Sequence, residues 1–227
     1  MRVFIFFVAV LLISPVLAQA QNVKVIRDLR SRTSIGAEKE IFNNLELFGN
    51  VEFGLEQDLE KIGKIHGEIG TNYSPFKFLA IEASYRYTKN RKNYKDEYKY
   101  NHTYAIAMEA DYKFDRFKTS YRIQYQNVDD EANWFASSDK TNNLVRNRVK
   151  LKYNIKGFKI EPYISTELYT PWDFAGLYAS KLKTYIGCEY KVKEVGVLKV
   201  YYRNDKELTQ FLPYSYHTLG IDFTFKF

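Results

Sequence analysis

Cysteine and proline are scarce in this chain of 227 residues, which contains one Cys and five Pro. The single Cys188 cannot form a disulfide within the chain, so covalent cross-links do not stabilise the fold. We interpret Cys188 as a small apolar residue on a strand. The chain is long enough for one all-β domain, and nothing in the sequence predicts a second domain.

Long hydrophobic runs are absent after residue 20, and the mean hydropathy of -0.43 excludes a helical membrane protein. At the N-terminus, Arg2 precedes an apolar run that ends at Ile13 and a small-residue pattern that ends at Ala20. This layout predicts a secretory signal peptide over 1–20, cleaved near Ala20, and a mature domain over 21–227. The residue directly after the cleavage site is Gln21 and not Cys, so we expect no lipid anchor.

The mature chain shows no sustained helical period, whereas alternation with period two recurs throughout. Side chains of a strand alternate between its two faces, so each such stretch predicts a strand with one apolar face. Leu219–Phe227 shows this most clearly, because Leu, Ile and three Phe occupy one face and Gly, Asp, Thr and Lys the other. The alternation predicts these strands: Thr33–Glu40, Leu45–Glu56, Ile65–Tyr73, Phe78–Thr88, Tyr104–Tyr112, Phe117–Gln126, Leu144–Tyr153, Phe158–Tyr169, Lys181–Tyr190, Val197–Arg203 and Leu219–Phe227.

Strand length and loop length together predict a single antiparallel up-and-down transmembrane β-barrel. Most predicted strands match the ~9–11 residues that cross a bilayer at a tilt. Tight turns alternate with longer polar loops, as in outer-membrane barrels. We expect about twelve strands, within a range of 10–12, because bacterial single-chain barrels have even numbers. An ambiguous segment over 22–32 would then supply a short twelfth strand, or would thread the lumen.

The apolar faces are predicted to point outward against lipid, in the bacterial outer membrane. Phe223, Phe225 and Phe227 resemble the closing strand of such barrels and would act as a membrane-insertion signal. The expected partners are outer-membrane lipids and the barrel-assembly machinery, and the expected state is a monomer. Aromatic residues bracket the apolar stripes as interfacial girdles do: Tyr73, Phe78, Tyr87, Tyr104, Tyr112, Phe117, Tyr125 and Tyr153.

Several short patterns resemble a bacterial outer-membrane family of unknown function, DUF2490. They are Tyr85-Arg86-Tyr87, Tyr121-Arg122, the pair Arg146 and Arg148, Pro162-Tyr163 with Glu167, and Gly187-Cys188-Glu189-Tyr190. The resemblance covers most of the mature chain. It implies an outer-membrane barrel and no assigned chemistry, so no residue role is carried over.

Charged side chains opposite the apolar faces are predicted to line the lumen. Acids dominate the early strands and bases the middle and late ones, which would set a transverse field across a pore. The sequence leaves two states open, a lumen filled by paired charges and a conducting pore. The lumen-lining candidates are Glu52, Glu82, Glu109, Arg122, Arg146, Arg148, Lys150, Glu167, Glu189 and Arg203.

We expect a structural or small-solute channel role, with no enzyme activity, cofactor or metal. A lipase or acyltransferase remains a rival, because Ser215 and His217 share a face near the outer rim with His102, although no third group completes a triad. A soluble secreted barrel that binds an apolar ligand is a second rival. The formal net charge of +7 accompanies no nucleic-acid recognition motif, so we expect no nucleic-acid partner. His66 is interpreted as a further polar group of the lumen.

Overall fold

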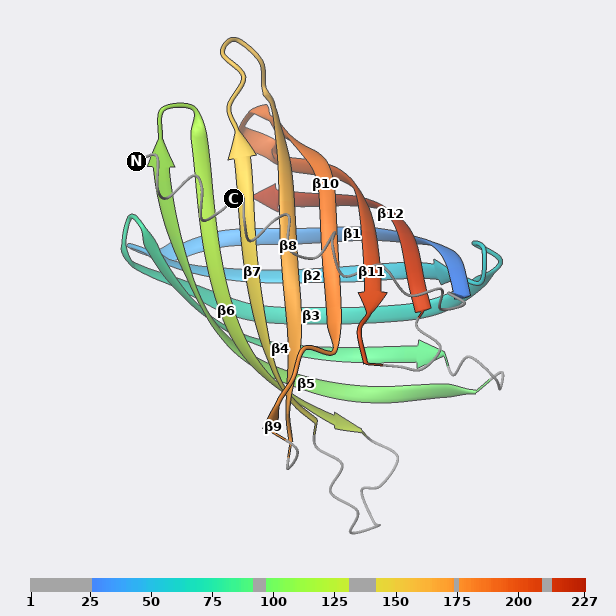
Figure 1. Ribbon diagram of the computed structural model, residues 1–227. Helices are drawn as coiled ribbons and strands as arrows, with labels where there is room; N and C mark the ends of the chain where they lie inside the picture. The colour runs from blue at the N-terminus through green and yellow to red at the C-terminus, as the bar shows by residue number, and fades with distance from the viewer. Residues whose placement is uncertain (1–25, 92–96, 131–141, 174–175, 210–213) are drawn as a thin grey trace.

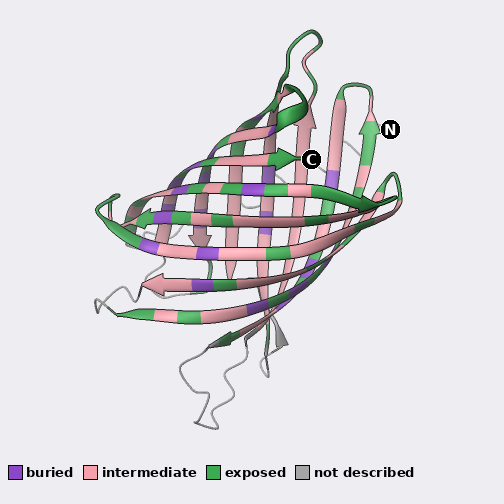
Figure 2. Ribbon diagram, turned by 180° about the vertical axis from the view of Figure 1, so that it is seen from behind, coloured by how far each residue is buried: buried purple, intermediate pink, exposed green. Residues whose placement is uncertain are grey.

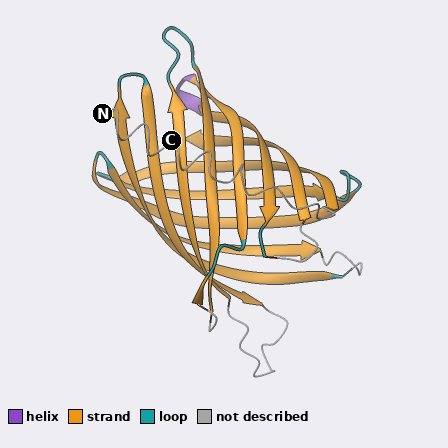
Figure 3. Ribbon diagram, in the orientation of Figure 1, coloured by secondary structure: helices purple, strands orange, loops and turns teal. Residues whose placement is uncertain are grey.

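The computed structural model describes residues 26–91, 97–130, 142–173, 176–209 and 214–227. The predicted signal peptide over 1–20 and residues 22–25 of the ambiguous segment lie outside these ranges. No described residue belongs to a helix long and apolar enough to cross a membrane. Strands dominate the described chain, and a single 3-10 turn, η2 (Lys193–Val195), joins two of them (Figure 3).

Eleven long strands close into one barrel (Figure 1). Neighbours in sequence pair antiparallel from β1 to β8, β8 pairs with β10, and β12 returns to β1. The two-residue β9 (Gly176–Leu177) pairs with the end of β8. The expected up-and-down barrel of 10–12 strands is therefore confirmed. The ring consists of β1 (Ile26–Phe42), β2 (Leu45–Glu56), β3 (Lys61–Phe76), β4 (Leu79–Arg91), β5 (Tyr98–Phe114), β6 (Phe117–Asp130), β7 (Asn142–Tyr153), β8 (Ile160–Asp173), β10 (Lys181–Val192), β11 (Gly196–Glu207) and β12 (Tyr214–Lys226).

The first and last strands of the ring run parallel, which corrects the preference for a separate twelfth strand. Residues 26–32 are the first part of β1, which continues without interruption to Phe42. The parallel register runs from Ile26↔Tyr214 to Glu38↔Lys226. β1 therefore starts at the same rim as β12, and an odd number of strands closes the ring.

The alternation of connections is largely as expected. Two residues join β1 to β2, β3 to β4 and β5 to β6, whereas 131–141 separate β6 from β7. Asn44 and Asp115 occupy two of the tight turns with φ of 68° and 49°, a conformation that Asn and Asp tolerate better than most residues. The connection from β2 to β3 is shorter than predicted, because β3 starts at Lys61 and leaves four residues, 57–60, between the strands.

The barrel is polar inside and apolar outside. Most buried side chains are polar or charged, including Arg32, Glu167 and Arg203, and the buried hydrophobic residues include Ala105 and Ala107. Large apolar side chains on the outer face are instead exposed, with Ile69 at 64% and Ile106 at 63%. Exposed and less exposed residues alternate along the strands (Figure 2). This arrangement is the reverse of a water-soluble core.

Aromatic side chains gather at both ends of the strands. Near the short turns, the ring of Phe117 lies 5.3 Å from Phe114 and 4.9 Å from Tyr153. Near the long loops, Tyr87 lies 6.0 Å from Tyr100, and Trp172 lies 6.4 Å from Tyr125. The outer surface thus carries aromatic groups toward both rims, with aliphatic side chains such as Ile69 and Ile106 in between.

Candidate functional site

The barrel encloses a cavity of about 980 Å³. All eleven long strands contribute lining residues, from Glu38 and Lys226 near the short turns to Arg30 and Asn90 near the long loops. Nearly every lining residue has a polar side chain, because each strand turns its polar face inward. The lumen is therefore the candidate site.

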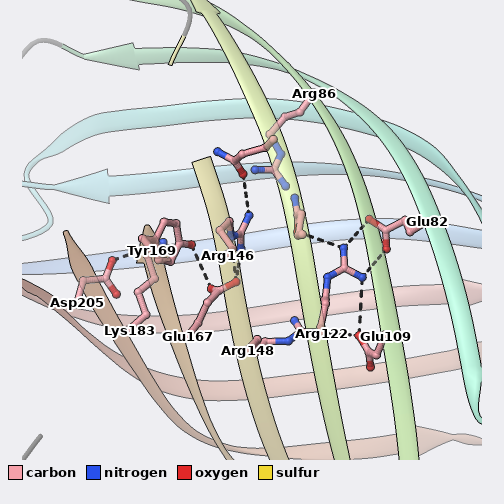
Figure 4. A network of polar contacts seen from close by, with 12 residues as sticks. Glu82, Arg86, Glu109, Arg122, Arg146, Arg148, Glu167, Tyr169, Lys183 and Asp205 are labelled. Atoms are coloured by element: carbon pink, nitrogen blue, oxygen red, sulfur yellow. Dashed lines mark hydrogen bonds and ion pairs between the residues drawn. The ribbon is translucent and has the colours of Figure 1, made fainter. Parts of the chain in front are cut away.

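The structure places all ten lumen-lining candidates on the wall of this cavity. It also places His66 there, next to Glu52, with its Nδ1 atom 3.4 Å from the carboxylate. The side chains of the lumen-lining candidates form a few clusters of ion pairs, and each cluster joins residues from different strands. Figure 4 shows the cluster formed by the middle strands.

Arg122 on β6 is the centre of the first cluster. Its guanidinium donates to both carboxylate oxygens of Glu82 on β4, at 2.9 and 2.8 Å, and lies 3.7 Å from Glu109 on β5. Ala107 is the inward residue of β5 in register with Glu82. Its small side chain leaves the space through which Arg122 reaches across β5. A bidentate Arg–carboxylate pair has a defined geometry, so it fixes the position of both side chains.

Arg146 and Arg148 on β7 form the adjoining pairs. Arg146 donates to Glu167 at 2.9 and 2.7 Å and to Gln126 at 3.2 Å. Arg148 donates to Glu109 at 2.8 Å, so Glu109 faces two guanidinium groups. These contacts continue the network around the lumen from β4 to β8 (Figure 4).

Lysines form a second cluster toward the short turns. Lys150 and Lys152 both donate to Glu189 on β10. Lys152 also lies 2.7 Å from Glu161 on β8, which accepts a hydrogen bond from Lys191 at 3.0 Å. The carboxylates are shared between lysines, so positive charge exceeds negative charge on this side.

Sequence reasoning missed several bases on the early strands. Arg32 lies 2.8 Å from Glu56, Lys64 lies 3.7 Å from Glu52, and Arg86 lies 2.8 Å from Glu68. The same period-two pattern that identified the acids could have identified these bases. Their positive charges offset the carboxylates of the early strands. The lumen lining of these strands, which was predicted to be acidic, is therefore close to neutral.

The positive charge is concentrated on one side of the lumen. We define the basic wall as the lining residues of β7, β8, β10 and β11, which include eight bases and three acids. The remaining lining residues include seven bases and eight acids. Glu161 and Glu207, which pair with wall lysines, lower the excess without removing it. The basic wall contains Arg146, Arg148, Lys150, Lys152, Tyr163, Ser165, Glu167, Tyr169, Lys181, Lys183, Tyr185, Glu189, Lys199, Tyr201, Arg203 and Asp205.

The residues of the hydrolase rival lie on the outer face and make other contacts. The Tyr202 hydroxyl lies 2.6 Å from His217 Nδ1, and Asn204 Nδ2 donates to Ser215 Oγ at 3.0 Å. In the described part of the chain no hydrogen bond joins Ser215 to His217. His102 lies 2.6 Å from the Tyr85 hydroxyl, on another part of the rim.

The phenylalanines of the last strand form a row on the outer face of the barrel. Phe223, Phe225 and Phe227 lie side by side on β12 and just after it, with ring centroids 4.7 and 6.2 Å apart. Over the described ranges, no cluster of three or more His, Cys, Asp and Glu residues could hold a metal ion.

A family model described as "Protein of unknown function (DUF2490)" matches residues 32–210. The match confirms the resemblance that the short aromatic and arginine patterns indicated. No curated protein matches the chain.

Proposed function

Because the chain belongs to the DUF2490 family, whose description assigns no activity, we propose a function from the barrel itself: an outer-membrane channel for small polar solutes. The proposal has two parts, a location in the outer membrane and conduction through the lumen. Each part depends on a different surface of the barrel.

The outer surface supports the location. Ile35, Ile69 and Ile106 are each more than 60% exposed on the outer face, and aromatic groups lie toward both rims. Burying apolar surface is favourable by roughly 25 cal/mol per Å², so a continuous apolar band would be costly in water and stabilising in lipid. The eleven long strands contain 12 to 17 residues, which exceeds the ~9–11 needed to span a bilayer.

The continuous polar cavity is the observation that carries the channel proposal. A volume of about 980 Å³ is enough for roughly 30 water molecules at ~30 Å³ each. Its lining reaches both ends of the strands, and its ion pairs lie along the wall. Barrels of about eight strands are filled by their own side chains and those of 16–18 leave an aqueous channel. An eleven-stranded ring lies between these cases.

Two experiments test the two parts. Cell fractionation should recover the mature protein in the outer-membrane fraction, and extraction should require detergent. A monomer that stays dissolved in plain buffer would refute the location and favour the soluble rival. Purified protein in planar bilayers should then give reproducible single-channel steps in KCl, absent when detergent alone is added. A membrane barrel without such steps would instead have a structural role.

A further inference from the structure

Two basic residues flank a serine on the outer face of the barrel, at the rim that carries the long loops. Lys206 on β11, Ser215 on β12 and Arg27 on β1 are successive partners in register, and we define these three residues as the rim row. We propose that the rim row binds the phosphate of an anionic lipid whose acyl chains lie on the neighbouring apolar surface. This inference rests on the proposed location in the outer membrane and does not depend on conduction.

The alternation of each strand turns the rim row outward. On β11, Asp205 lines the lumen, so Lys206 faces the opposite side of the sheet. On β1, Arg30 lines the lumen, and Arg27 lies an odd number of positions away, so it also faces outward and is exposed. The three strands are neighbours in the ring (Figure 1). Because neighbouring strands lie ~4.8 Å apart, both long side chains can reach an anion above Ser215.

The acids nearest to the rim row are engaged elsewhere. On the lumen side, Asp28 lies 2.7 Å from Arg30. On the same side, Glu207 lies 3.9 Å from Lys181. In the turn between β2 and β3, Asp58 Oδ1 accepts a hydrogen bond from the backbone of β1 at 3.1 Å. Among the described residues, no acid lies within ion-pair distance of either base of the rim row, so both charges remain available to an anion.

The serine supplies a hydroxyl between the two bases. Ser215 Oγ accepts a hydrogen bond from Asn204 Nδ2 at 3.0 Å, which leaves the hydroxyl hydrogen for an acceptor oxygen. In the next row, His217 Nδ1 lies 2.6 Å from the Tyr202 hydroxyl. The rim row therefore offers a guanidinium, an ammonium and a hydroxyl on one small patch. Charged donors of this kind form strong hydrogen bonds with phosphate oxygens.

Apolar side chains follow these polar rows toward the middle of the barrel. Leu219 and Ile221 on β12 are 55% and 50% exposed, Val200 on β11 is 49% exposed and Ile35 on β1 is 61% exposed. We define these four residues as the seam strip. The registers place them further from the long loops than the rim row, on the same three strands. The order from the rim is thus basic, polar and apolar, which is also the order of groups in an anionic lipid.

This order specifies the class of lipid and its leaflet. Two positive charges favour a lipid of net negative charge over a zwitterionic lipid, whose own cation would be repelled by them. The seam strip favours a lipid over free phosphate, because it would bury acyl chains. Long loops of outer-membrane barrels face the cell exterior, so the site belongs to the outer leaflet.

Native mass spectrometry of the barrel in an uncharged detergent tests the proposal, because it counts the lipids bound at each concentration. Phosphatidylglycerol is the anionic probe, and phosphatidylcholine with the same acyl chains is the zwitterionic one. We expect phosphatidylglycerol to bind about tenfold more tightly, and millimolar inorganic phosphate not to displace it. Equal affinity for the two lipids would overturn the proposal. Displacement by inorganic phosphate would assign the rim row to free phosphate and would also overturn it.

Paired variants locate the site. Arg27→Gln with Lys206→Gln should raise the dissociation constant for phosphatidylglycerol about tenfold and leave that for phosphatidylcholine unchanged. The matched control is Lys89→Gln with Arg91→Gln, which removes one lysine and one arginine from the outward face of β4 near the same rim. Circular dichroism confirms that each variant retains its β-structure. Equal effects of the two pairs would refute a specific site.

A second substitution tests the hydroxyl without changing the charge. Ser215→Ala should weaken the binding of phosphatidylglycerol about threefold, since one hydrogen bond is lost. Ser215→Thr retains a hydroxyl and should bind like the original protein. Equal binding by the Ala and Thr variants would contradict a contact between this hydroxyl and the phosphate.

The outcomes separate this inference from the proposed function. A protein that fractionates with the outer membrane but binds both lipids equally refutes the lipid site and leaves the location intact. Conduction is measured in a separate experiment, so a barrel without single-channel steps can still support the site. A monomer that stays dissolved in plain buffer refutes the location, and the lipid site with it.

Discussion

Arg122 reaches Glu82 across an intervening strand, with both guanidinium nitrogens within 2.9 Å of the two carboxylate oxygens. The contact joins β6 to β4 over Ala107 of β5, so it supports the barrel wall independently of the backbone ladder. Such pairs recur between Arg148 and Glu109 and between Lys150 and Glu189. Each of these ion pairs therefore links a strand to the next strand but one around the barrel.

The Arg122–Glu82 pair gives a first prediction. Arg122→Ala leaves a carboxylate without its bidentate partner, and should lower the free energy of unfolding by about 2 kcal/mol. Glu82→Ala with Arg122→Ala should cost less than the single Arg122→Ala change, because no unpaired charge remains. Urea unfolding in detergent measures both. Additive losses in the double variant would contradict the coupling. Ile123→Ala, on the outer face of the same strand, is the control.

Ion selectivity gives a second prediction. Replacing Arg146 and Arg148 by Glu should shift selectivity toward cations, because both side chains line the basic wall. The reversal potential in a KCl gradient measures the shift. Arg148→Glu combined with Glu109→Arg retains the pair and the net charge, and should change selectivity much less. An unchanged reversal potential in the variant that carries both Arg146→Glu and Arg148→Glu would mean that the basic wall does not line the conducting path.

The seam between β1 and β12 gives a third prediction. Ile35 and Phe223 are register partners across the parallel pair. In a Cys188→Ala background, Ile35→Cys with Phe223→Cys should therefore form a disulfide on mild oxidation. An intervening strand would separate the two Cα atoms by about 9–10 Å, beyond the ~7 Å limit for a disulfide. Ile35→Cys with Leu219→Cys is the out-of-register control. Gel mobility with and without reductant reports the cross-link, and its absence would contradict the seam.

The close approach of Tyr201 to Gly220 gives a fourth prediction. Gly220→Ala should lower the free energy of unfolding by about 1–3 kcal/mol, because the added methyl group overlaps the Tyr201 ring. The same change in a Tyr201→Ala background should cost much less. Gly67→Ala is the matched control, since an added Cβ there meets no atom within 4 Å. Equal losses in the two backgrounds would show that Tyr201 does not occupy the space above Gly220.

The row of phenylalanines gives a fifth prediction. Replacing Phe223, Phe225 and Phe227 by Ser should reduce the amount of assembled barrel in the membrane fraction, because the row is proposed to direct insertion. The same number of outward apolar residues changed on β2, at Leu47, Val51 and Phe53, controls for lost hydrophobicity. Membrane-fraction yield and heat-modified gel mobility measure assembly. An equal loss in the β2 control would refute a specific signal.

Period-two alternation was sufficient to predict most of the fold. β2 matches its predicted bounds of Leu45–Glu56, because its inward and outward residues differ sharply in polarity. Other strands extend further, as β4 does to Arg91. Lys89 and Asn90 pair with Tyr100 and Lys99, since the backbone ladder continues where side chains no longer alternate in polarity. Polarity alone therefore underestimates strand length near the loops.

The ion-pair network and the ring closure could not be predicted in the same way. Which acid pairs with Arg122 depends on the register of β5 and on the small size of Ala107, neither of which the alternation specifies. The odd strand count depends on β1 being one strand from Ile26 to Phe42, whereas the sequence left the segment over 22–32 ambiguous between a separate short strand and a segment in the lumen. Arg30 and Arg32 are lumen residues, and their inward position follows from the continuous strand.

The parallel seam also limits how the barrel can be re-engineered. In an even-stranded barrel the first and last strands meet at one rim, so a short peptide can join them and the chain can be reopened at another loop. Here β1 begins and β12 ends at opposite rims, so a circular permutant would need a linker as long as the barrel is tall. Routed through the interior, that linker would plug it.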